Sequence, residues 1–451
     1  MSFLSRLKAR IDARLARHGD LGAKLIKGFL GTGGIRLAHA VIGFATGILL
    51  ARSLGPSDYG TYTFVMAMVG FLTIPSELGI PGLAVREIAV ANARKDWGTM
   101  RGFILRAHQG IAALSLLLIA LGALGLVVFG DRIDPVRRQC MWFALALVPL
   151  ISLGALRAAM LRGLRKVLLG QLPEQVIRPA ALLLLIVAIL AFYRESMSPQ
   201  MMVLAQIAAT TIAFAWGLVV FVRHRPPQLA SASPAYQTSA WIRSTLPFGL
   251  SAALLLLNGR TDILALGLFH PDSEVGIYRV AVQMTLPVLF AQQAVNAIQA
   301  PHIAHLYAAG DMKRLQRMVT QSSRAVLAVS ASAALVVILF GEPLIRVLFG
   351  AEYTAAYVPL VILALGKTVN SAMGSVASLL NMTGHERDAM RSILVAAVLN
   401  VVLNVTLTPA WGMTGAAIAT AATLVVWNVV MWHTVKRRIG IQSSAFLRRA
   451  Q

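Results

Sequence analysis

Residues 49–66 read LLARSLGPSDYGTYTFVM and residues 263–283 read ILALGLFHPDSEVGIYRVAVQ, and these two stretches decide the fold. Each ends one apolar segment, turns at a proline and starts a second segment with a glycine two residues before a tyrosine. These glycines, Gly60 and Gly276, are 216 residues apart. The match predicts that the chain contains an internal repeat whose two copies run in the same orientation.

The composition predicts a membrane protein. Of the 451 residues, 57% are hydrophobic and 13% charged, and the mean hydropathy is +0.71. A soluble domain carries about 25% charged residues, whereas a membrane span needs about 20 mostly apolar residues. We therefore predict an all-α, polytopic fold with about twelve spans. The expected spans are residues 33–53, 59–78, 107–129, 140–158, 176–193, 201–222, 246–269, 275–300, 325–349, 355–379, 389–408 and 415–435.

The distribution of charge predicts the topology. The chain has 41 Lys and Arg against 18 Asp and Glu, a net charge of +23 that would suggest nucleic acid in a soluble protein. Most of these basic residues lie at the N-terminus, in the tail and in the loops after the even-numbered spans. That alternation is the positive-inside pattern, so both termini are expected in the cytoplasm.

The repeat and the spans together predict five regions. Parallel repeats related by an axis along the membrane normal are typical of transporters, with the substrate site between the two lobes. The predicted regions are a basic amphipathic N-terminus lying on the inner leaflet (1–30), an N-lobe (31–222), a cytoplasmic linker (223–245), a C-lobe (246–435) and a basic cytoplasmic tail (436–451). Two further amphipathic segments, Val85–Met100 and Asp311–Arg324, are expected on the inner leaflet.

Several motifs resemble the polysaccharide (Wzx-type) flippases of the multidrug/oligosaccharidyl-lipid/polysaccharide exporter superfamily. They are LLARSLGPSDYGTY from Leu49, ELG from Glu77, VRE from Val85, LRG from Leu161 and NVVLNVTLTPAWGMTGAAIAT from Asn400. The resemblance covers essentially the whole chain. It implies a V-shaped bundle of two six-helix lobes that alternate access to a central cavity.

The resemblance also implies a function. Members of this family flip undecaprenyl-pyrophosphate-linked oligosaccharides from the inner to the outer leaflet of the bacterial cytoplasmic membrane. The products would serve O-antigen, lipopolysaccharide, capsule or exopolysaccharide biosynthesis. Expected partners are the lipid-linked substrate, membrane lipids, and a polysaccharide polymerase with its chain-length machinery. No nucleic acid and no enzymatic activity is expected.

Basic residues within the predicted spans are candidates for binding the anionic headgroup, because charges at membrane depth are costly and usually face a cavity. Lys367 lies halfway along its span with Asn370 on the same helix face, and Arg260 lies past the middle of another. Three more, Arg36, Arg52 and Arg279, lie near the ends of spans. Arginine can bind a pyrophosphate through paired hydrogen bonds. The alternative for the last three is that they extend to lipid headgroups.

Asp262 is a candidate coupling-ion site, with Asn258 one helical turn before it. A buried carboxylate can bind a proton or hold Na⁺. The alternative is a salt bridge to a basic residue on a neighbouring helix. No cofactor and no resident metal is expected: Cys140 is the single cysteine, and the nine histidines lack metal-binding spacing.

Three other functions compete with this one. A lipid II flippase would share the fold and the cationic cavity. A cation-coupled multidrug exporter would favour acidic residues in the cavity, and spans 1 to 6 contain almost none. A membrane glycosyltransferase or polymerase would need a carboxylate cluster or a large outer loop, and the predicted outer loops are short.

Overall fold

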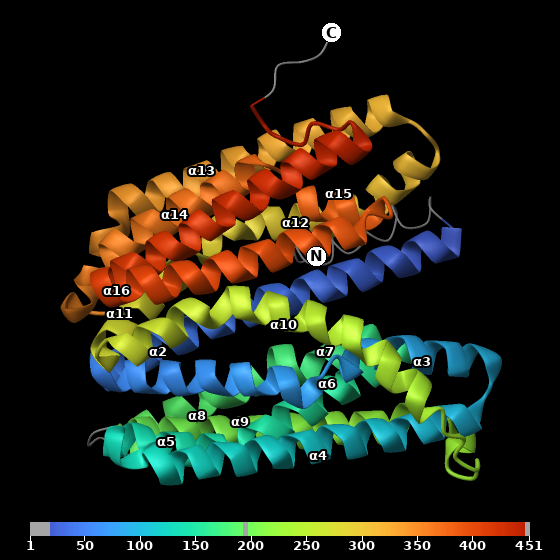
Figure 1. Cartoon of the computed structure of the whole chain (residues 1–451), viewed down its shortest axis with the longest axis horizontal. Coiled ribbons are helices and arrows are strands. Elements are labelled where there is room, and N and C mark those ends of the chain that lie inside the picture. Colours follow the sequence, from blue (N-terminus) through green and yellow to red (C-terminus); the bar gives the residue numbers. More distant parts are fainter. Residues whose placement is uncertain (1–18, 193–196, 447–451) are drawn as a thin grey trace, which may run out of the picture.

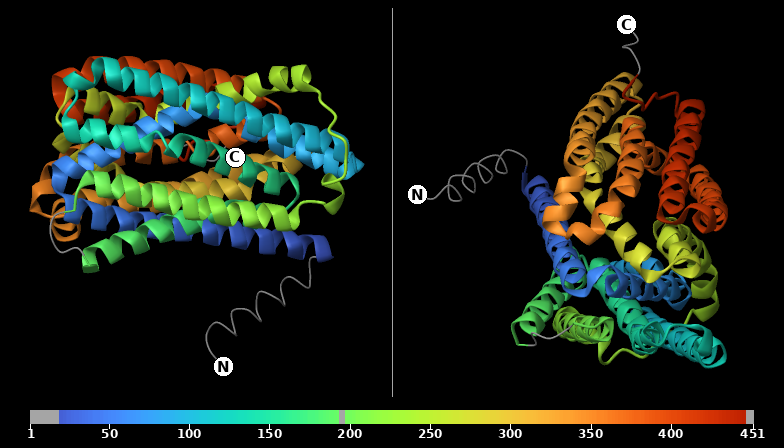
Figure 2. Two further views of the ribbon diagram at one scale, coloured as in Figure 1. Left: turned by 90° about the horizontal axis from the view of Figure 1, so that it is seen from below. Right: turned by 90° about the vertical axis from the view of Figure 1, so that its left-hand side faces the viewer.

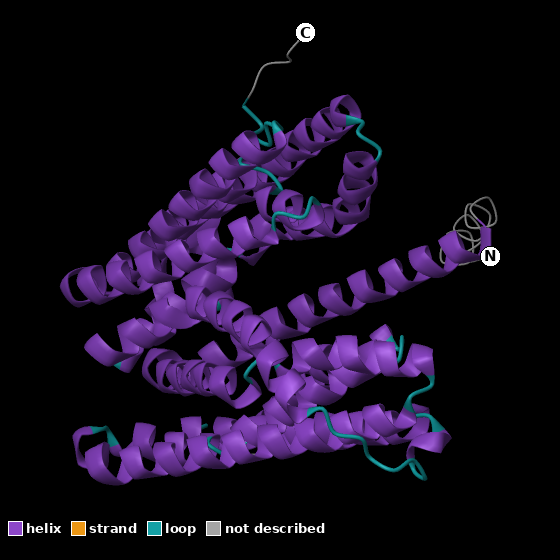
Figure 3. Ribbon diagram, turned by 45° about the vertical axis from the view of Figure 1, so that its right-hand side comes forward, coloured by secondary structure: helices purple, strands orange, loops and turns teal. Residues whose placement is uncertain are grey.

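The computed structural model describes residues 19–192 and 197–446, and throughout these residues the regular structure is helical (Figure 3). The all-α prediction is confirmed. Most of the predicted amphipathic N-terminus, residues 1–18, lies outside the described part, as do residues 447–451 of the predicted tail.

The first half of the chain forms one lobe of packed helices. Its helices are α2 (Gly19–Glu77), α3 (Ile80–Arg94), α4 (Trp97–Phe129), α5 (Pro135–Ala144), α6 (Leu147–Gly163), α7 (Val167–Leu172), α8 (Arg178–Phe192) and α9 (Pro199–His224). Short turns η2 (Gly130–Arg132) and η3 (Pro173–Ile177) join α4 to α5 and α7 to α8. Figure 1 shows this N-lobe in blue to green.

The second half forms the other lobe, after a linker with the short turn η4 (Pro227–Leu229). Its elements are α10 (Thr238–Phe269), α11 (Asp272–Met284), α12 (Leu286–Ala308), α13 (Met312–Leu348), η5 (Ala351–Ala356), α14 (Tyr357–Ala372), α15 (Val376–Met382) and α16 (Glu386–Ile439). Figure 1 shows this C-lobe in yellow to red, and the end view in Figure 2 separates it from the N-lobe.

Two very long helices each contain two of the predicted spans. In α2 the helix is interrupted at Gly55 (φ 73°), which Pro56 follows, and in α16 it is interrupted at Gly412 (φ 54°). Glycine reaches this left-handed conformation without a Cβ clash, so the chain turns there without an intervening loop. Figure 1 shows α2 doubling back at the left of the view.

The number of spans differs from the prediction. By length and apolar composition, eight helices of the described residues could cross a membrane, or ten if each of two bent helix pairs is one span. Since α2 and α16 each count once in that number, the expected twelve spans are not confirmed as separate helices. The difference arises because a non-helical glycine, rather than a loop, divides each of the two longest helices.

The hydrophobic core shows where the lobes meet. One cluster of buried residues contains Leu50 and Val65 of α2 together with Tyr278 of α11 and Tyr353 of η5, so both lobes share it. Two smaller clusters lie at the other end of the molecule, one around α3 and α6 and one around α13 and α15. The lobes thus share a core at one end and diverge toward the other (Figure 3), where α10 still contacts the N-lobe, at Gly249 against Gly79.

The two predicted amphipathic segments do not form separate helices along their whole length. The first is divided at Lys95 and Asp96, between α3 and α4, and the Asp96 carboxylate accepts a hydrogen bond from the Thr99 amide at 3.0 Å. The second begins with Asp311, which caps α13 by accepting from the Arg314 amide at 3.0 Å. Residues 312–324 are therefore the start of the long apolar helix α13.

Candidate functional site

A cavity of about 610 Å³ lies between the lobes. It is lined from the N-lobe by α2, α6, α8 and α9 and from the C-lobe by α10 and α11. Along the part of α2 after Gly55 its lining runs from Tyr59 to Glu77, a helix length of about 27 Å at 1.5 Å per residue. That length is comparable to the hydrocarbon thickness of a bilayer, about 30 Å.

Three arginines line this cavity. Arg260 of α10 reaches across to the N-lobe, where its Nη1 donates to the Met66 carbonyl at 3.3 Å. Its guanidinium occupies the space beside Gly70 that a Cβ would fill. Arg178 of α8 forms an ion pair with Glu174 at 2.8 Å, and Arg279 of α11 completes the set. Arg260 and Arg279 are two of the five predicted basic residues, and the structure brings them to one cavity.

Neutral polar groups lie in the same cavity. The Tyr62 hydroxyl donates to Gln206 Oε1 at 3.1 Å, and Tyr59 donates to Gln283 Oε1 at 3.4 Å. Gln283 crosses from the C-lobe, and its Nε2 donates to the carbonyl of Phe44 at 2.9 Å. Hydroxyls and amides are thus available beside the arginines for hydrogen bonding.

Two charged residues of the cavity lining, Arg178 and Glu77, were not predicted as site residues. Arg178 was expected at the start of a span, but Pro173 lies in a π-helical turn that continues the helix from Val167. Arg178 therefore lies eleven residues after Val167, the first residue of the candidate membrane span Val167–Phe192, and so well inside that span. Glu77 also lines the cavity, and among the described residues its carboxylate has no hydrogen bond or ion pair. Its position in a family motif was the available signal.

Lys367 and Asn370 lie inside the C-lobe. Lys367 is 9% exposed and donates to the Thr285 hydroxyl, while Asn370 donates to Gln292 at 2.7 Å and accepts from Asn428 at 2.6 Å. Neither is among the described residues that line the cavity between the lobes. They form a polar network of α12, α14 and α16.

Asp262 is buried in the C-lobe without a basic partner in the described part of the chain. It accepts hydrogen bonds from the Ile263 amide and the Tyr278 hydroxyl, each at 2.8 Å, and from Thr420 at 3.4 Å. The alternative of a direct salt bridge is therefore not found. Asn258 instead donates to the Leu254 carbonyl at 3.0 Å within its own helix.

The other two predicted basic residues lie away from the cavity lining. Arg36 is exposed on the first part of α2. Arg52 donates to the carbonyl of Val347 in α13, so it links the lobes at the joined end. The Tyr353 hydroxyl makes a similar link to the Ala51 carbonyl at 2.8 Å.

The joined end is built around the two repeat-related glycines. A Cβ on Gly60 would collide with the backbone of Asp272, and one on Gly276 would collide with the backbone of Pro56. Pro56 and Asp272 are themselves 216 residues apart, so the two contacts are reciprocal. The backbones of α2 and α11 therefore touch across a local pseudo-twofold axis, and no side chain separates the lobes there.

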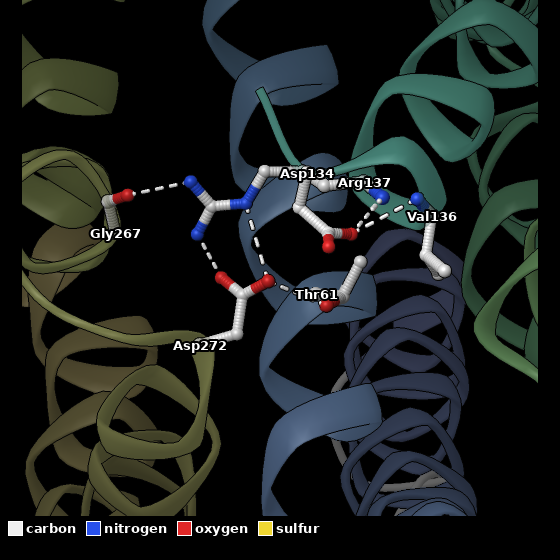
Figure 4. A network of polar contacts seen from close by, with 6 residues as sticks. All are labelled: Thr61, Asp134, Val136, Arg137, Gly267 and Asp272. Atoms are coloured by element: carbon white, nitrogen blue, oxygen red, sulfur yellow. Dashed lines mark hydrogen bonds and ion pairs between the residues drawn. The ribbon is translucent and has the colours of Figure 1, made fainter. Parts of the chain in front are cut away.

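A charged network surrounds this contact (Figure 4). Arg137 of α5 forms an ion pair with Asp272 of the C-lobe and donates to the Gly267 carbonyl at 2.8 Å. The Thr61 hydroxyl donates to Asp272 at 2.6 Å, and the Arg137 guanidinium lies 4.3 Å from the centroid of the Phe64 ring. Thr61 lies between the cavity residues Tyr59 and Tyr62, so this group lies at the end of the cavity opposite Glu77. We call the group formed by Thr61, Arg137, Gly267 and Asp272 the latch.

Known proteins are similar to this chain in sequence. Residues 25–300 match the family described as "Polysaccharide biosynthesis protein", and residues 247–406 match the MatE family. The probable low-salt glycan biosynthesis flippase Agl15 of Haloferax volcanii is 24% identical over 399 residues, which cover 87% of this chain and 79% of that protein. The probable flippase AglR of the same organism is 27% identical over 183 residues, 40% of this chain and 38% of that protein.

Solved structures share the fold. A multidrug resistance MATE family transporter of the MOP superfamily, in an inward-facing conformation, superposes with a TM-score of 0.72 at 14% identity, covering 90% of this chain and 98% of that one. The lipid II flippase MurJ, in an inward closed conformation, gives 0.71 at 13% identity, covering 89% and 87%. The chain is a multi-pass membrane transporter of the flippase kind, and it belongs to the polysaccharide biosynthesis protein family of that superfamily.

Proposed function

We propose that this transporter flips an undecaprenyl-pyrophosphate-linked oligosaccharide from the inner to the outer leaflet by alternating access between its lobes. The observation that carries the proposal is the set of three arginines, Arg178, Arg260 and Arg279, in one cavity between the lobes. A pyrophosphate must lose much of its hydration at membrane depth. Guanidinium groups can replace that hydration with charge-assisted hydrogen bonds.

The oligosaccharide would occupy the same cavity. Tyr59, Tyr62, Gln206 and Gln283 offer neutral donors and acceptors, which suit hydroxyl-rich sugars. The lining that the structure describes has one carboxylate to balance the arginines, Glu77, and this carboxylate forms no ion pair within the described residues. This balance favours an anionic substrate over the organic cations that a multidrug exporter would take.

The remaining predicted basic residues have a place in the proposal at different stages. Arg36, exposed near the start of α2, would meet the headgroup before it enters the cavity, and Arg52 would meet it at the latch end once that end opens. Lys367 and Asn370 would take part only if the C-lobe interior opens toward the cavity. Lys367→Ala is accordingly expected to slow flipping less than loss of either Arg260 or Arg279.

Asp262 is proposed as the coupling site, for either Na⁺ or a proton. The Tyr278 and Thr420 hydroxyls that now donate to its carboxylate can also accept, so they could turn to coordinate a bound Na⁺. Asn258, one turn earlier on α10, would support this site. Asp262→Asn is expected to abolish the dependence of flipping on the coupling ion.

We place the transporter in the bacterial cytoplasmic membrane with both termini in the cytoplasm. The latch would then close the outer end, and the end near Glu77 would open to the cytoplasm. The products would pass to a polysaccharide polymerase and its chain-length machinery, for O-antigen, capsule or exopolysaccharide. A lipid II flippase is the second candidate, because the same cationic cavity fits its pyrophosphate and the fold matches MurJ as well as it matches the MATE transporter.

The test is a flipping assay with the full chain in liposomes, using a fluorescent undecaprenyl-pyrophosphate oligosaccharide. Arg260→Ala and Arg279→Ala should each slow flipping about tenfold or more, because each removes charge-assisted hydrogen bonds of about 1.5–3 kcal/mol. The matched control is Arg346→Ala, which removes an arginine that is 63% exposed on α13 and should leave the rate unchanged.

Each outcome of this assay has a distinct meaning. Wild-type rates in both cavity variants would contradict binding by the arginine cavity. Flipping of lipid II but not of the oligosaccharide would assign the second candidate instead. Export of organic cations with no lipid flipping would overturn the proposal in favour of a multidrug exporter.

A further inference from the structure

The segment His270–Glu274 joins α10 to α11 and includes the first residues of α11. It makes contacts on two sides, one with the latch and one with α16. Asp272 faces the N-lobe and accepts from Thr61 and Arg137 in the latch. His270 and Glu274 face the other way, toward the interruption of α16 at Gly412. A change at either attachment can therefore be transmitted through five residues to the other.

The hydrogen bonds of His270 determine its protonation in this arrangement. Its Nε2 lies 2.8 Å from the carbonyl oxygen of Thr408, which can only accept, so Nε2 must carry a hydrogen. Its Nδ1 lies 3.2 Å from Glu274 Oε1. If the imidazole were neutral and the carboxylate ionised, two lone pairs would face each other across that contact. The contact is therefore a hydrogen bond only when one further proton lies between Nδ1 and Oε1.

That proton is connected to the backbone of α16. The second carboxylate oxygen of Glu274 accepts from the Met413 amide at 3.2 Å. Met413 follows Gly412, whose backbone lies directly against both Glu274 and His270. Loss of the shared proton makes the His270–Glu274 contact repulsive, and separating the two residues breaks the bond to Thr408 or the bond to Met413.

We propose that His270 and Glu274 form a proton-binding site that holds the latch end of the lobes closed while the proton is bound. The side chains are 20% and 30% exposed, so the site can exchange protons with water at that end. The closed state is thus favoured at low pH and lost as the pH rises. The inference rests on the proposed function only in taking this end as the outer one.

Other charged groups lie on the elements that contact α10 and α11, and they must be distinguished from His270 and Glu274. On α16 the contacting residues Thr408, Gly412 and Met413 bring no titratable side chain. On α10 itself and on the other elements that contact α10 or α11, these charged residues have partners elsewhere: Arg137 of α5 on Asp272, Arg52 of α2 on the Val347 carbonyl, Asp58 of α2 near Asp134, Glu352 of η5 beside Gly350, Lys367 of α14 on Thr285, and Asp262 with Tyr278. Among them, Asp58 and Asp262 are the groups whose titration must be separated from that of His270.

The experiment measures the distance between the lobes at the latch end as a function of pH. Cys140 is the single cysteine, so a Cys140→Ala background accepts spin labels at Arg132→Cys in η2 and Ala351→Cys in η5, both exposed. The full chain is placed in lipid nanodiscs without substrate. A proton bound only in the closed state should change the closed-to-open ratio by up to about tenfold per pH unit within its titration range.

Two substitutions should each remove the pH response, for different reasons. In His270→Gln the titrating ring is lost, so the distance distribution should no longer change with pH. In Glu274→Gln an amide replaces the carboxylate and can donate to Nδ1 at every pH, so the latch end should stay closed when the pH rises. His433→Gln, an exposed histidine at the far end of α16, is the matched control and should keep the wild-type response.

A pH-independent distance in the wild type would overturn the proposal, as would an unchanged pH response in either variant. If His270→Gln fails to fold, Glu274→Gln alone decides. A response that disappears in Asp262→Asn or Asp58→Asn but persists in both variants would assign the proton elsewhere. Because no substrate is present, this result stands whether or not the flipping assay succeeds.

Discussion

The latch end of the interface between the lobes and the wall of the cavity are built differently. At the latch end, Gly60 and Gly276 let backbones touch, and a core cluster is shared between the lobes. Along the cavity, the lobes meet through long side chains such as Arg260 and Gln283, which cross to the N-lobe backbone. Backbone contact permits a single closed arrangement, whereas long side chains can release one partner and take another. The latch end therefore suits a gate, and the cavity wall suits a binding site.

The largest effect is expected from filling the backbone contact. In Gly276→Leu the side chain would have to occupy the position of the Pro56 backbone, so the closed state should fall at least a hundredfold relative to the open one. The spin-label pair at the latch end measures this change. Gly125→Leu, with open space around the new side chain, is the matched control. A closed latch in Gly276→Leu would contradict the backbone contact.

A smaller effect is expected from removing the ion pair of the latch. In the closed state the Arg137 and Asp272 side chains are only 17% and 13% exposed, so Arg137→Ala leaves a carboxylate with little access to water. We expect the closed state to lose about 2 kcal/mol, roughly thirtyfold in the closed-to-open ratio. The same label pair reports it. If Arg138→Ala, which breaks an exposed ion pair to Asp131, had an equal effect, the role assigned to Arg137 would be wrong.

The smallest effect concerns one hydroxyl. Thr61→Val keeps the shape of the side chain and removes the hydrogen bond to Asp272, so the expected loss is about 1 kcal/mol, roughly fivefold. Thr211→Val, whose hydroxyl bonds only within its own helix, should leave the ratio unchanged. An effect of Thr61→Val as large as that of Arg137→Ala would mean that the hydroxyl, rather than the ion pair, dominates the latch.

The sequence predicted the helical class, the family and the repeat because these depend on local composition and on motifs read along the chain. It named Arg260 for its depth in a span and Arg279 as a basic residue near the end of one, and both line the cavity. It missed Arg178 because the span was expected to begin at residue 176, which put Arg178 near its end, whereas the helix begins at Val167. It could not anticipate the partner of Asp272, since Arg137 lies 135 residues away on the other lobe. Contacts between lobes depend on how closely helices approach, which no local pattern records.

The reciprocal contact of Gly60 and Gly276 has a consequence for how such a chain can change over generations. If a six-helix chain paired with itself through this face, one glycine would sit against its own copy. Every substitution there would then be made twice, once on each side of the axis. In the fused chain the two positions are inherited separately. The two sides can therefore differ while the backbone contact stays the same: Asp272 stands on one side and Pro56 on the other.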